Sequence, residues 1–233
     1  KIPCISIIIP TFKREDQTTQ TLKILYQSTG WNSEYIPEVI IADSTPGESV
    51  KKAISVFSDP TPIYIKPEMP GIAANKNIGA KTAKNEILIF CDSDMEVEKD
   101  TLLNTLIYLK DHPKTAMLSG QVIWRGSDLD GQRDRPRKED RMENIYNTVF
   151  IEAIYSRYMA TYKTTFWQVG GYDEEVFNMR GEGSDLSIRY WRSGFPLSYD
   201  GKIIVHHVHD APSAATRNIE YPERGIIRDL IQL

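Results

Sequence analysis

Two carboxylates, separated by one residue, follow directly on an apolar run of the chain. Asp92 and Asp94 flank Ser93, and residues 86–91 before them have the sequence EILIFC. In an extended segment, side chains two residues apart project to the same side, so both acids can face one ligand. Carboxylate oxygens suit Mg²⁺ or Mn²⁺, and Mg²⁺ commonly binds one or two carboxylates together with substrate phosphates. A D-x-D pattern also occurs in solvated turns, but its place after a strand favours a site for a cation and a diphosphate.

Three of the four histidines of the chain lie within residues 206–209, which have the sequence HHVH. On a strand, His207 and His209 project to one face and His206 projects to the other. Imidazole is the commonest metal ligand in proteins. The cluster predicts that one of these histidines binds a metal, while packing of the others is the simpler alternative.

Residues 71–80 (GIAANKNIGA) are rich in glycine and alanine. Such residues allow a helix to lie close to a sheet or to a ligand. On this helix, Lys76 can face a phosphate and Asn77 can hydrogen-bond a nucleotide or a backbone group. The alternative is a helix that packs tightly on the sheet and binds nothing.

Residues 181–189 (GEGSDLSIR) form a further candidate segment. Acids in the first turn of a helix are favoured by the helix dipole, which gives Asp185 a purely structural explanation. A glutamate such as Glu182, placed near an acceptor hydroxyl, can also act as a general base. The residues alone leave both explanations open.

The elements that must position these side chains alternate along the first half of the chain. Short β-branched runs bounded by turns predict strands, and apolar residues at helical spacing lie between them. This alternation predicts an α/β fold with a mainly parallel sheet flanked by helices, whose ligands bind outside the carboxyl ends of the strands. Polar clusters lie at three of these ends: 11–14, 43–45 and 92–94. The predicted strands are 5–9, 38–42, 62–66 and 86–91, and the predicted helices are 16–27, 49–57 and 71–83.

The second half of the sequence is less regular. Residues 125–144 are highly charged, which predicts a solvated loop; loops of this length are often functional, so an acceptor-side flap is the alternative. Residues 219–233 predict a surface segment, with a helix that contacts a membrane or a partner as the alternative. The pattern further predicts helices at 100–110, 145–158 and 185–192 and strands at 116–124 and 201–209.

Composition excludes some classes of protein. A net charge of -4 over 233 residues argues against a dedicated nucleic-acid binder and allows one large α/β domain or two small ones. Cys4 and Cys91 are expected to be buried thiols in a reducing compartment. No apolar run is long enough to cross a bilayer and no signal peptide is evident, so a cytoplasmic location is expected, with the inner face of the membrane as an alternative. The start at Lys1 suggests an excised fragment, whose anchor can lie elsewhere.

The ordered set of segments resembles the family 2 glycosyltransferases of the GT-A fold. The resemblance covers residues 5 to about 210. The complete set of segments in this order is specific to the family, although each segment alone is not. It implies one domain over 1–233, with a nucleotide-binding half at about 1–96, an acceptor and sugar half at about 97–215 and a tail at 216–233. The matching pieces are ISIIIPTFKR, IIADSTPG, GIAANKNIGAKTA, ILIFCDSDMEV, QVGGYDEEVF, GEGSDLSIRYWRSG and VHHVHD.

The resemblance also implies a role for each matching residue. The acids of the D-x-D motif would meet the ribose and a Mn²⁺ or Mg²⁺ ion, with Asp94 binding the metal directly and His207 or His209 as the late metal or diphosphate ligand. Tyr172 and Asp173, after a Gly-Gly turn, would border the sugar pocket. The expected nucleotide and donor contacts are Pro10, Thr11, Arg14, Asp43, Lys76, Asn77, Asp92 and Ser93.

One position departs from the family pattern. Relatives usually carry Glu-Asp-x-Asp-Leu, whose second acid is the catalytic base, and this chain has Gly183 there. Glu182 is therefore the expected base and Asp185 the alternative. The change is also compatible with a displaced base, a different acceptor or lost activity.

The expected function is that of a metal-dependent glycosyltransferase of the hexosyltransferase class. It would move a sugar from a nucleotide diphosphate to a carbohydrate, lipid-linked or other hydroxyl acceptor, with inversion, in polysaccharide or glycoconjugate synthesis. A sugar-nucleotide-binding domain with weak or no catalysis is the alternative, favoured by Gly183. A nucleotidyltransferase is disfavoured because residues 11–14 (TFKR) lack the glycine-rich loop such enzymes carry after the first strand. The sugar, the base of the nucleotide and the acceptor stay open.

Overall fold

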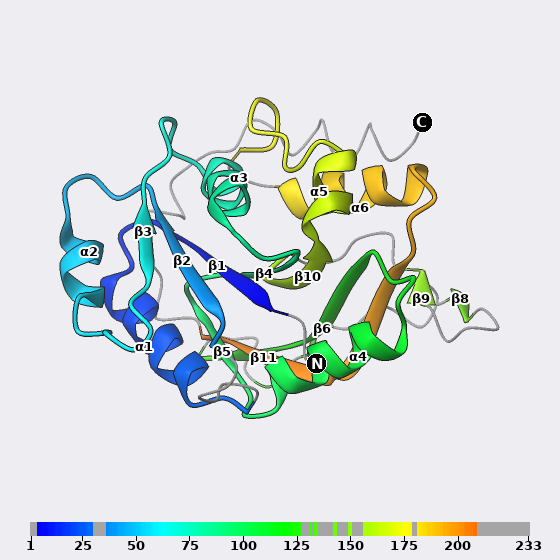
Figure 1. Ribbon diagram of the computed structural model, residues 1–233, viewed down its shortest axis with the longest axis horizontal. Helices are drawn as coiled ribbons and strands as arrows, with labels where there is room; N and C mark the ends of the chain where they lie inside the picture. The colour runs from blue at the N-terminus through cyan, green and yellow to red at the C-terminus, as the bar shows by residue number, and fades with distance from the viewer. Residues whose placement is uncertain are drawn as a thin grey trace.

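The computed structural model describes residues 4–29, 36–126, 156–178 and 181–208, together with the short pieces 131, 133–134, 142–143 and 149–150. A nine-stranded sheet runs through these residues and has helices on both faces (Figure 1). Its strands lie in the order β3-β2-β1-β4-β10-β6-β11-β5, with β7 paired to β6, and β8 and β9 form a separate pair. The predicted α/β architecture is therefore confirmed.

The first half has the predicted alternation of strands and helices. Its four strands are parallel to one another, and their carboxyl ends meet at one edge of the sheet. The strands are β1 (Ile5–Thr11), β2 (Glu38–Asp43), β3 (Ile63–Ile65) and β4 (Ile87–Cys91); the helices are α1 (Glu15–Tyr26), α2 (Ser49–Ile54) and α3 (Ile72–Thr82). Each predicted element of this half is present.

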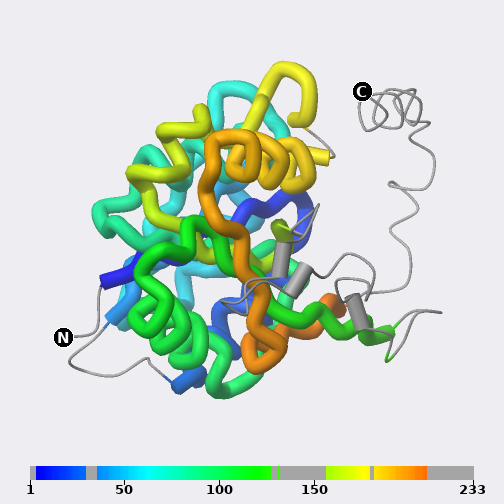
Figure 2. The backbone as a smooth tube through the Cα atoms, turned by 90° about the vertical axis from the view of Figure 1, so that its right-hand side faces the viewer, coloured from blue at the N-terminus to red at the C-terminus, as the bar shows by residue number. Residues whose placement is uncertain are grey.

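The second half continues the sheet with mixed strand directions. Strand β10 lies between β4 and β6 and is antiparallel to both, whereas β6 and β11 are parallel and lie side by side (Figure 2). The remaining elements are β5 (Met95–Val97), α4 (Thr101–Asp111), β6 (Met117–Arg125), β7 (Arg133–Asp134), β8 (Met142–Glu143), β9 (Val149–Phe150), β10 (Tyr158–Tyr162), α5 (Lys163–Gln168), α6 (Glu182–Arg192) and β11 (Leu197–Val208).

The helix predicted at 145–158 is wrong where the structure describes it. Residues 149–150 form strand β9, and Tyr158 is the first residue of β10. In β10, Tyr158 and Ala160 pack in one core and Met159 packs in the other, so the run alternates between faces as a strand does. Short apolar runs of this kind do not distinguish a buried strand from a helix. The predicted tail at 219–233 lies outside the described residues, as does most of the predicted loop at 125–144. The loop prediction is wrong in the described parts of this segment, where β6 ends at Arg125 and β7 and β8 form.

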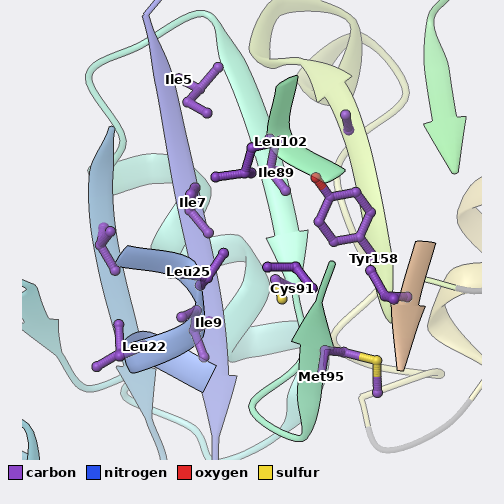
Figure 3. Packing of buried hydrophobic residues seen from close by; sticks show 14 of the residues in the cluster. Ile5, Ile7, Ile9, Leu22, Leu25, Ile89, Cys91, Met95, Leu102 and Tyr158 are labelled. Atoms are coloured by element: carbon purple, nitrogen blue, oxygen red, sulfur yellow. The ribbon is translucent and has the colours of Figure 1, made fainter. Parts of the chain in front are cut away.

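Two apolar cores cover the two faces of the sheet. Ile5, Ile7 and Ile9 of β1 face the core that includes α1 and α4 (Figure 3), whereas Ile8 faces the core formed with α3, α5 and α6. Full burial of one such side chain contributes about 1.5–3 kcal/mol. A Cβ placed on Gly79 would lie 2.3 Å from Cγ2 of Ile8, which explains why α3 needs small residues.

Cys91 is buried, as expected, but Cys4 is exposed because it precedes the first residue of β1. Burial of both thiols was therefore a wrong expectation. Among the described residues, every helix is too short or too polar to traverse a bilayer. The division of the chain into two halves and a tail stays a prediction.

Candidate active site

The D-x-D motif lies on a tight turn between β4 and β5. The backbone N–H of Met95 donates to the carbonyl of Asp92 at 3.1 Å, which closes the turn. The expectation that Asp92 and Asp94 project together from an extended segment is therefore wrong. Because the chain reverses here, Asp92 faces Lys76 of α3 and Asp94 faces Arg14 and His207.

Asp94 gathers two basic groups from distant parts of the chain. Its Oδ2 accepts from Nη1 of Arg14, the N-cap residue of α1, and lies 3.2 Å from Nε2 of His207 on β11. Burial alone would raise the pKa of Asp94, but the His207 hydrogen bond and the Arg14 charge hold that pKa well below its usual value. The carboxyl group is therefore ionised throughout the neutral range.

His206 and His207 face opposite sides of β11, as the alternation of a strand requires. His206 Nε2 lies 3.0 Å from Oε1 of Glu98, whereas His207 belongs to the Asp94 group. The side chain of Glu98 is about half exposed, and Asp94 is nearly buried. Two acid–imidazole pairs of similar chemistry thus lie on either side of one strand. His209 is outside the described residues.

The Asp94 group has ligands that suit a divalent cation. It offers one carboxylate oxygen and one imidazole nitrogen at the same place. Oδ1 of the nearby Asp92 is buried and has the ammonium group of Lys76 at 3.3 Å as an ion-pair partner, but it accepts no hydrogen bond from the described residues. Among the described residues, no group of three or more His, Cys, Asp and Glu side chains is placed to hold a metal ion. A cation here would thus leave positions for phosphate oxygens and water, the arrangement that Mg²⁺ prefers.

A hollow of about 440 Å³ opens beside Asp94, between α1 and the ends of β5 and β11. Polar side chains of α1 and Glu96 of β5 line it, so Asp94 can be reached by a dissolved ion. The residues that line the hollow include Gln17, Gln20, Thr21, Asp94, Glu96 and Val208.

Lys76 is fully buried at the centre of a second charged group. Its Nζ lies 3.3 Å from Oδ1 of Asp92, 3.2 Å from Oε1 of Glu182 and 3.0 Å from Oγ of Ser156. The ring of Tyr172 lies 5.3 Å from the same nitrogen. Burial alone would lower the pKa of Lys76, but the charges of Asp92 and Glu182 keep it well above its usual value. Lys76 is therefore a permanent cation that joins α3, α6 and the D-x-D turn.

The two acids around Lys76 respond differently to this environment. Burial raises the pKa of Asp92, and the negative charges of Asp94 and Glu182 add to the effect, although Lys76 opposes it. Burial would also raise the pKa of Glu182, but Lys76 and the Ser156 hydroxyl bring it below its usual value. This group contains two acids and one cation, so a further positive charge near Asp92 would be electrostatically favourable.

The residues at the ends of β1 and β2 are held mainly by the protein itself. Thr11 is buried and shares a hydrogen bond of 2.9 Å with Thr18. Asp43 accepts from the backbone N–H of Thr45 and from the hydroxyl of Tyr64, both at 2.7 Å. Pro10 is also buried, within β1. These groups lie at the carboxyl edge of the sheet, where the nucleotide is predicted to bind.

Ser93 and Asn77 also have protein partners. The carbonyl of Ser93 accepts from the hydroxyl of Thr21 at 3.0 Å. The Asn77 amide donates to the carbonyl of Tyr172 at 2.8 Å and to Glu174 at 2.6 Å, and its oxygen accepts from the Tyr172 N–H at 2.9 Å. Asn77 thus fixes the turn after Gly171, which carries Tyr172 to Lys76.

The two candidate bases lie in different surroundings. Glu182 is the first residue of α6 and belongs to the Lys76 group. Asp185, one turn later, pairs with Arg189 at 2.5 Å, and Arg189 also donates to the carbonyl of Val169. The structure therefore brings Glu182, and not Asp185, into contact with the group that contains Asp92.

Two residues of this region, Ser156 and Asn178, were not predicted from the sequence. Ser156 contacts both Lys76 and Glu182, and no local motif marks it. Asn178 takes up the first amides of α3: its carbonyl accepts from Ile72 and Ala73 at 2.8 and 3.2 Å, and its Oδ1 accepts from Ala74 at 3.2 Å. The only signal for Asn178 was indirect, since α3 follows Gly71 and has no side-chain cap of its own.

Comparison with known proteins gives a consistent result. Residues 6–170 match the model of the family described as glycosyl transferase family 2. An uncharacterized glycosyltransferase of Haemophilus influenzae is 34% identical over 90 residues, which is 39% of this chain and 29% of that protein. The chain therefore spans only part of the relatives it matches.

Solved structures share the fold at low sequence identity. The mannosyltransferase PcManGT of Pyrobaculum calidifontis, in complex with GDP-Man and Mn²⁺, is 18% identical with a TM-score of 0.68, over 92% of this chain and 59% of that one. GalNAc-T7 with UDP, GalNAc and Mn²⁺ is 18% identical with a TM-score of 0.72, over 90% and 44%. These structures confirm the GT-A type of fold.

Proposed function

Because the chain belongs to glycosyl transferase family 2, we propose that it transfers a sugar from a nucleotide diphosphate to an acceptor hydroxyl with the help of a divalent cation. The observation that carries this proposal is the meeting of Asp94 and His207, which places an ionised carboxylate and an imidazole together beside an open hollow. The two similar structures with nucleotides and Mn²⁺ support it.

Asp94 and His207 would hold Mn²⁺ or Mg²⁺, with Asp92 close by, and the ion would offset the charge of the leaving diphosphate. Arg14 already neutralises part of the Asp94 charge, so it would turn toward a phosphate oxygen when the cation takes its place. Lys76 stays buried and holds Asp92 from behind. Pro10, Thr11 and Asp43 would carry the nucleoside at the edge of the sheet, and Ser93 and Asn77 would shape the floor and wall of the donor site.

Glu182 is the proposed general base for the acceptor hydroxyl. It shares the Lys76 group with Asp92, whereas the alternative base, Asp185, is engaged by Arg189. A base on the side of the sugar opposite the diphosphate would give inversion. The acceptor class stays open between carbohydrate, lipid-linked and other hydroxyl compounds of polysaccharide or glycoconjugate synthesis.

A second candidate function is a sugar-nucleotide-binding domain with weak or no catalysis. The observation that favours it is the lowered pKa of Glu182, because a carboxylate that is stabilised by Lys76 and Ser156 is a weaker base. The same binding surface would serve both functions, so binding alone does not separate them.

The test combines binding and turnover. The melting temperature of the protein is measured with UDP and with GDP, each in the presence and absence of MnCl₂. The nucleotide that raises the melting temperature only when MnCl₂ is present identifies the donor class. Sugar nucleotides of that class are then assayed for transfer and for hydrolysis. Stabilisation with turnover supports the transferase, and stabilisation without turnover supports the binding domain. Equal melting temperatures with and without both ligands would overturn both proposals.

A further inference from the structure

Gly183 and Ser156 lie so close together that position 183 has no room for a side chain. A Cβ on Gly183 would lie 2.7 Å from Oγ and 2.8 Å from Cβ of Ser156, and 3.2 Å from its backbone nitrogen. Real Cβ atoms do not approach other heavy atoms to less than about 3 Å in a close-packed interior. The acid that α6 presents at this site therefore comes from Glu182.

The hydroxyl of Ser156 has a fixed hydrogen-bonding role. It accepts from Nζ of Lys76 at 3.0 Å and donates to Oε1 of Glu182 at 2.9 Å. The Ser156 carbonyl lies 3.3 Å from the same Lys76 nitrogen. Because a serine hydroxyl has only one proton, acceptance from the lysine directs that proton to Glu182.

The topology of the sheet explains how Ser156 reaches this place. Strand β10 is antiparallel to β4, so the start of β10 meets the end of β4. The carbonyl of Arg157 accepts from the N–H of Asp92 at 2.8 Å, which fixes the segment beside the D-x-D turn. Ser156, one residue earlier, is consequently held between that turn and the first turn of α6.

We propose that Ser156 is a positioning residue for sugar transfer, which acts through Glu182 by holding its carboxylate beside Lys76. This inference rests on the proposed function. Without the hydroxyl, Oε1 of Glu182 would keep Lys76 but lose the hydrogen bond from Ser156, and an ammonium group imposes little direction on its partner. A displacement of about 1 Å at a reacting group can cost about 100-fold in rate, so a partial loss of order is expected to cost about 10-fold.

The experiment compares wild type, Ser156→Ala, Glu182→Gln and the double variant. Donor turnover is measured with Mn²⁺ and the UDP- or GDP-sugar that the wild type uses, with water as the acceptor where no other is known. Single-turnover conditions, with enzyme in excess, keep slow variants measurable. We expect Ser156→Ala to lower kcat about 10-fold, to leave the donor KM within about 2-fold, and to cause no further loss in the Glu182→Gln background.

A matched control is Ser119→Ala. Ser119 is also a buried serine that donates to β10, at 2.9 Å to the carbonyl of Tyr158, and its contact there is with the strand and not with Glu182. Its kcat should stay close to that of the wild type. If Ser156→Ala folds poorly, Gly183→Ala provides a second route, because the added methyl group must displace Ser156. The pair Gly183→Ala with Ser156→Gly should then regain thermal stability but not kcat.

Each failure has a distinct signature. An unchanged kcat in Ser156→Ala, an equal loss in the wild-type and Glu182→Gln backgrounds, or an equal loss in Ser119→Ala would overturn the role of Ser156. If the wild type turns over none of the UDP- and GDP-sugars, the proposed function fails and the positioning role fails with it. If the wild type turns over a sugar nucleotide and Ser156→Ala has the same kcat, only the positioning role is overturned and the proposed function stands.

Discussion

Asp94 Oδ2 and His207 Nε2 lie 3.2 Å apart although 113 positions separate the two residues in the sequence. The first belongs to the turn after β4 and the second to β11, near the end of the described chain. The same strand carries a second acid–imidazole pair, Glu98 and His206, on its other face. The nearly buried Asp94–His207 pair can therefore be compared with the Glu98–His206 pair, whose acid is about half exposed.

This comparison makes the cation site testable. Asp94→Asn should weaken Mn²⁺ binding and lower kcat by at least about 100-fold, because a bound metal contributes several kcal/mol to the transition state. Glu98→Gln removes a carboxylate from the other pair and should leave both quantities near wild type. Mn²⁺ binding is measured by isothermal titration calorimetry in the presence of UDP or GDP. Equal effects of the two substitutions would contradict the assignment.

Lys76 should be a major contributor to stability. Lys76→Met leaves Asp92 and Glu182 buried without their cation, and loss of one member of a buried ion pair costs about 3–5 kcal/mol. Urea unfolding measures this change. The exposed Lys51–Glu48 pair supplies the control, since Lys51→Met should have no measurable effect. Addition of Asp92→Asn and Glu182→Gln to Lys76→Met should recover part of the loss.

The Glu182 carboxylate should stabilise the fold only above acidic pH. Its pKa is lowered from the ordinary 4.5 on folding, so its contribution is complete above that value and is lost as the pH falls through the folded-state pKa. The difference in unfolding free energy between wild type and Glu182→Gln should therefore shrink as the pH falls from about 6 to about 3, a range that extends about 1.5 units on either side of 4.5.

The raised pKa of Asp92 acts in the opposite direction, and the Glu182 charge contributes to it, so the difference in unfolding free energy is taken between two proteins that both carry Asp92→Asn. Urea unfolding at several pH values gives that difference. A difference that stays constant, or that grows as the pH falls, would show that Glu182 is not the stabilised carboxylate described here.

Asn178 should stabilise α3 from a distance. Asn178→Ala removes the bonds of its side chain to the N–H of Ala74 and to the carbonyl of Pro70. Loss of a capping side chain costs about 0.5–2 kcal/mol, which should appear in urea unfolding and in faster amide exchange at the start of α3. Asn104→Ala removes a single exposed bond to Lys202 and should cost less. Equal losses would argue against the capping role.

The parallel half of the fold follows from local pattern. Runs such as ISIII and EVIIA are bounded by turns, and each stands next to a helix with apolar spacing, so residues that are close in sequence suffice to place them. Strand β10 depends instead on two partners, β4 and β6, that precede it by tens of residues. Its short run carries no signal that separates a strand between them from a helix.

The candidate site shows the same division. The sequence predicted Asp94 and His207 as ligands of a cation and Glu182 as the catalytic base. The structure places Asp94 next to His207 and Glu182 next to Lys76. The contact of Ser156 with Lys76, the contact of Asn178 with Pro70 and the meeting of Asp94 with His207 come from tertiary packing across about 80 to 113 positions. No periodicity or motif in the sequence encodes such contacts, so the sequence alone does not predict them.

The antiparallel placement of β10 also bears on how the chain can be divided. A fragment that ends near residue 97 would contain β1 to β5 but would lack β10, which would leave the fully apolar β4 as an open edge of the sheet. Exposed edges of this kind template pairing with other chains. We therefore expect the predicted nucleotide-binding half to aggregate when it is expressed alone, and a hybrid protein with an exchanged second half to need a strand that pairs with β4.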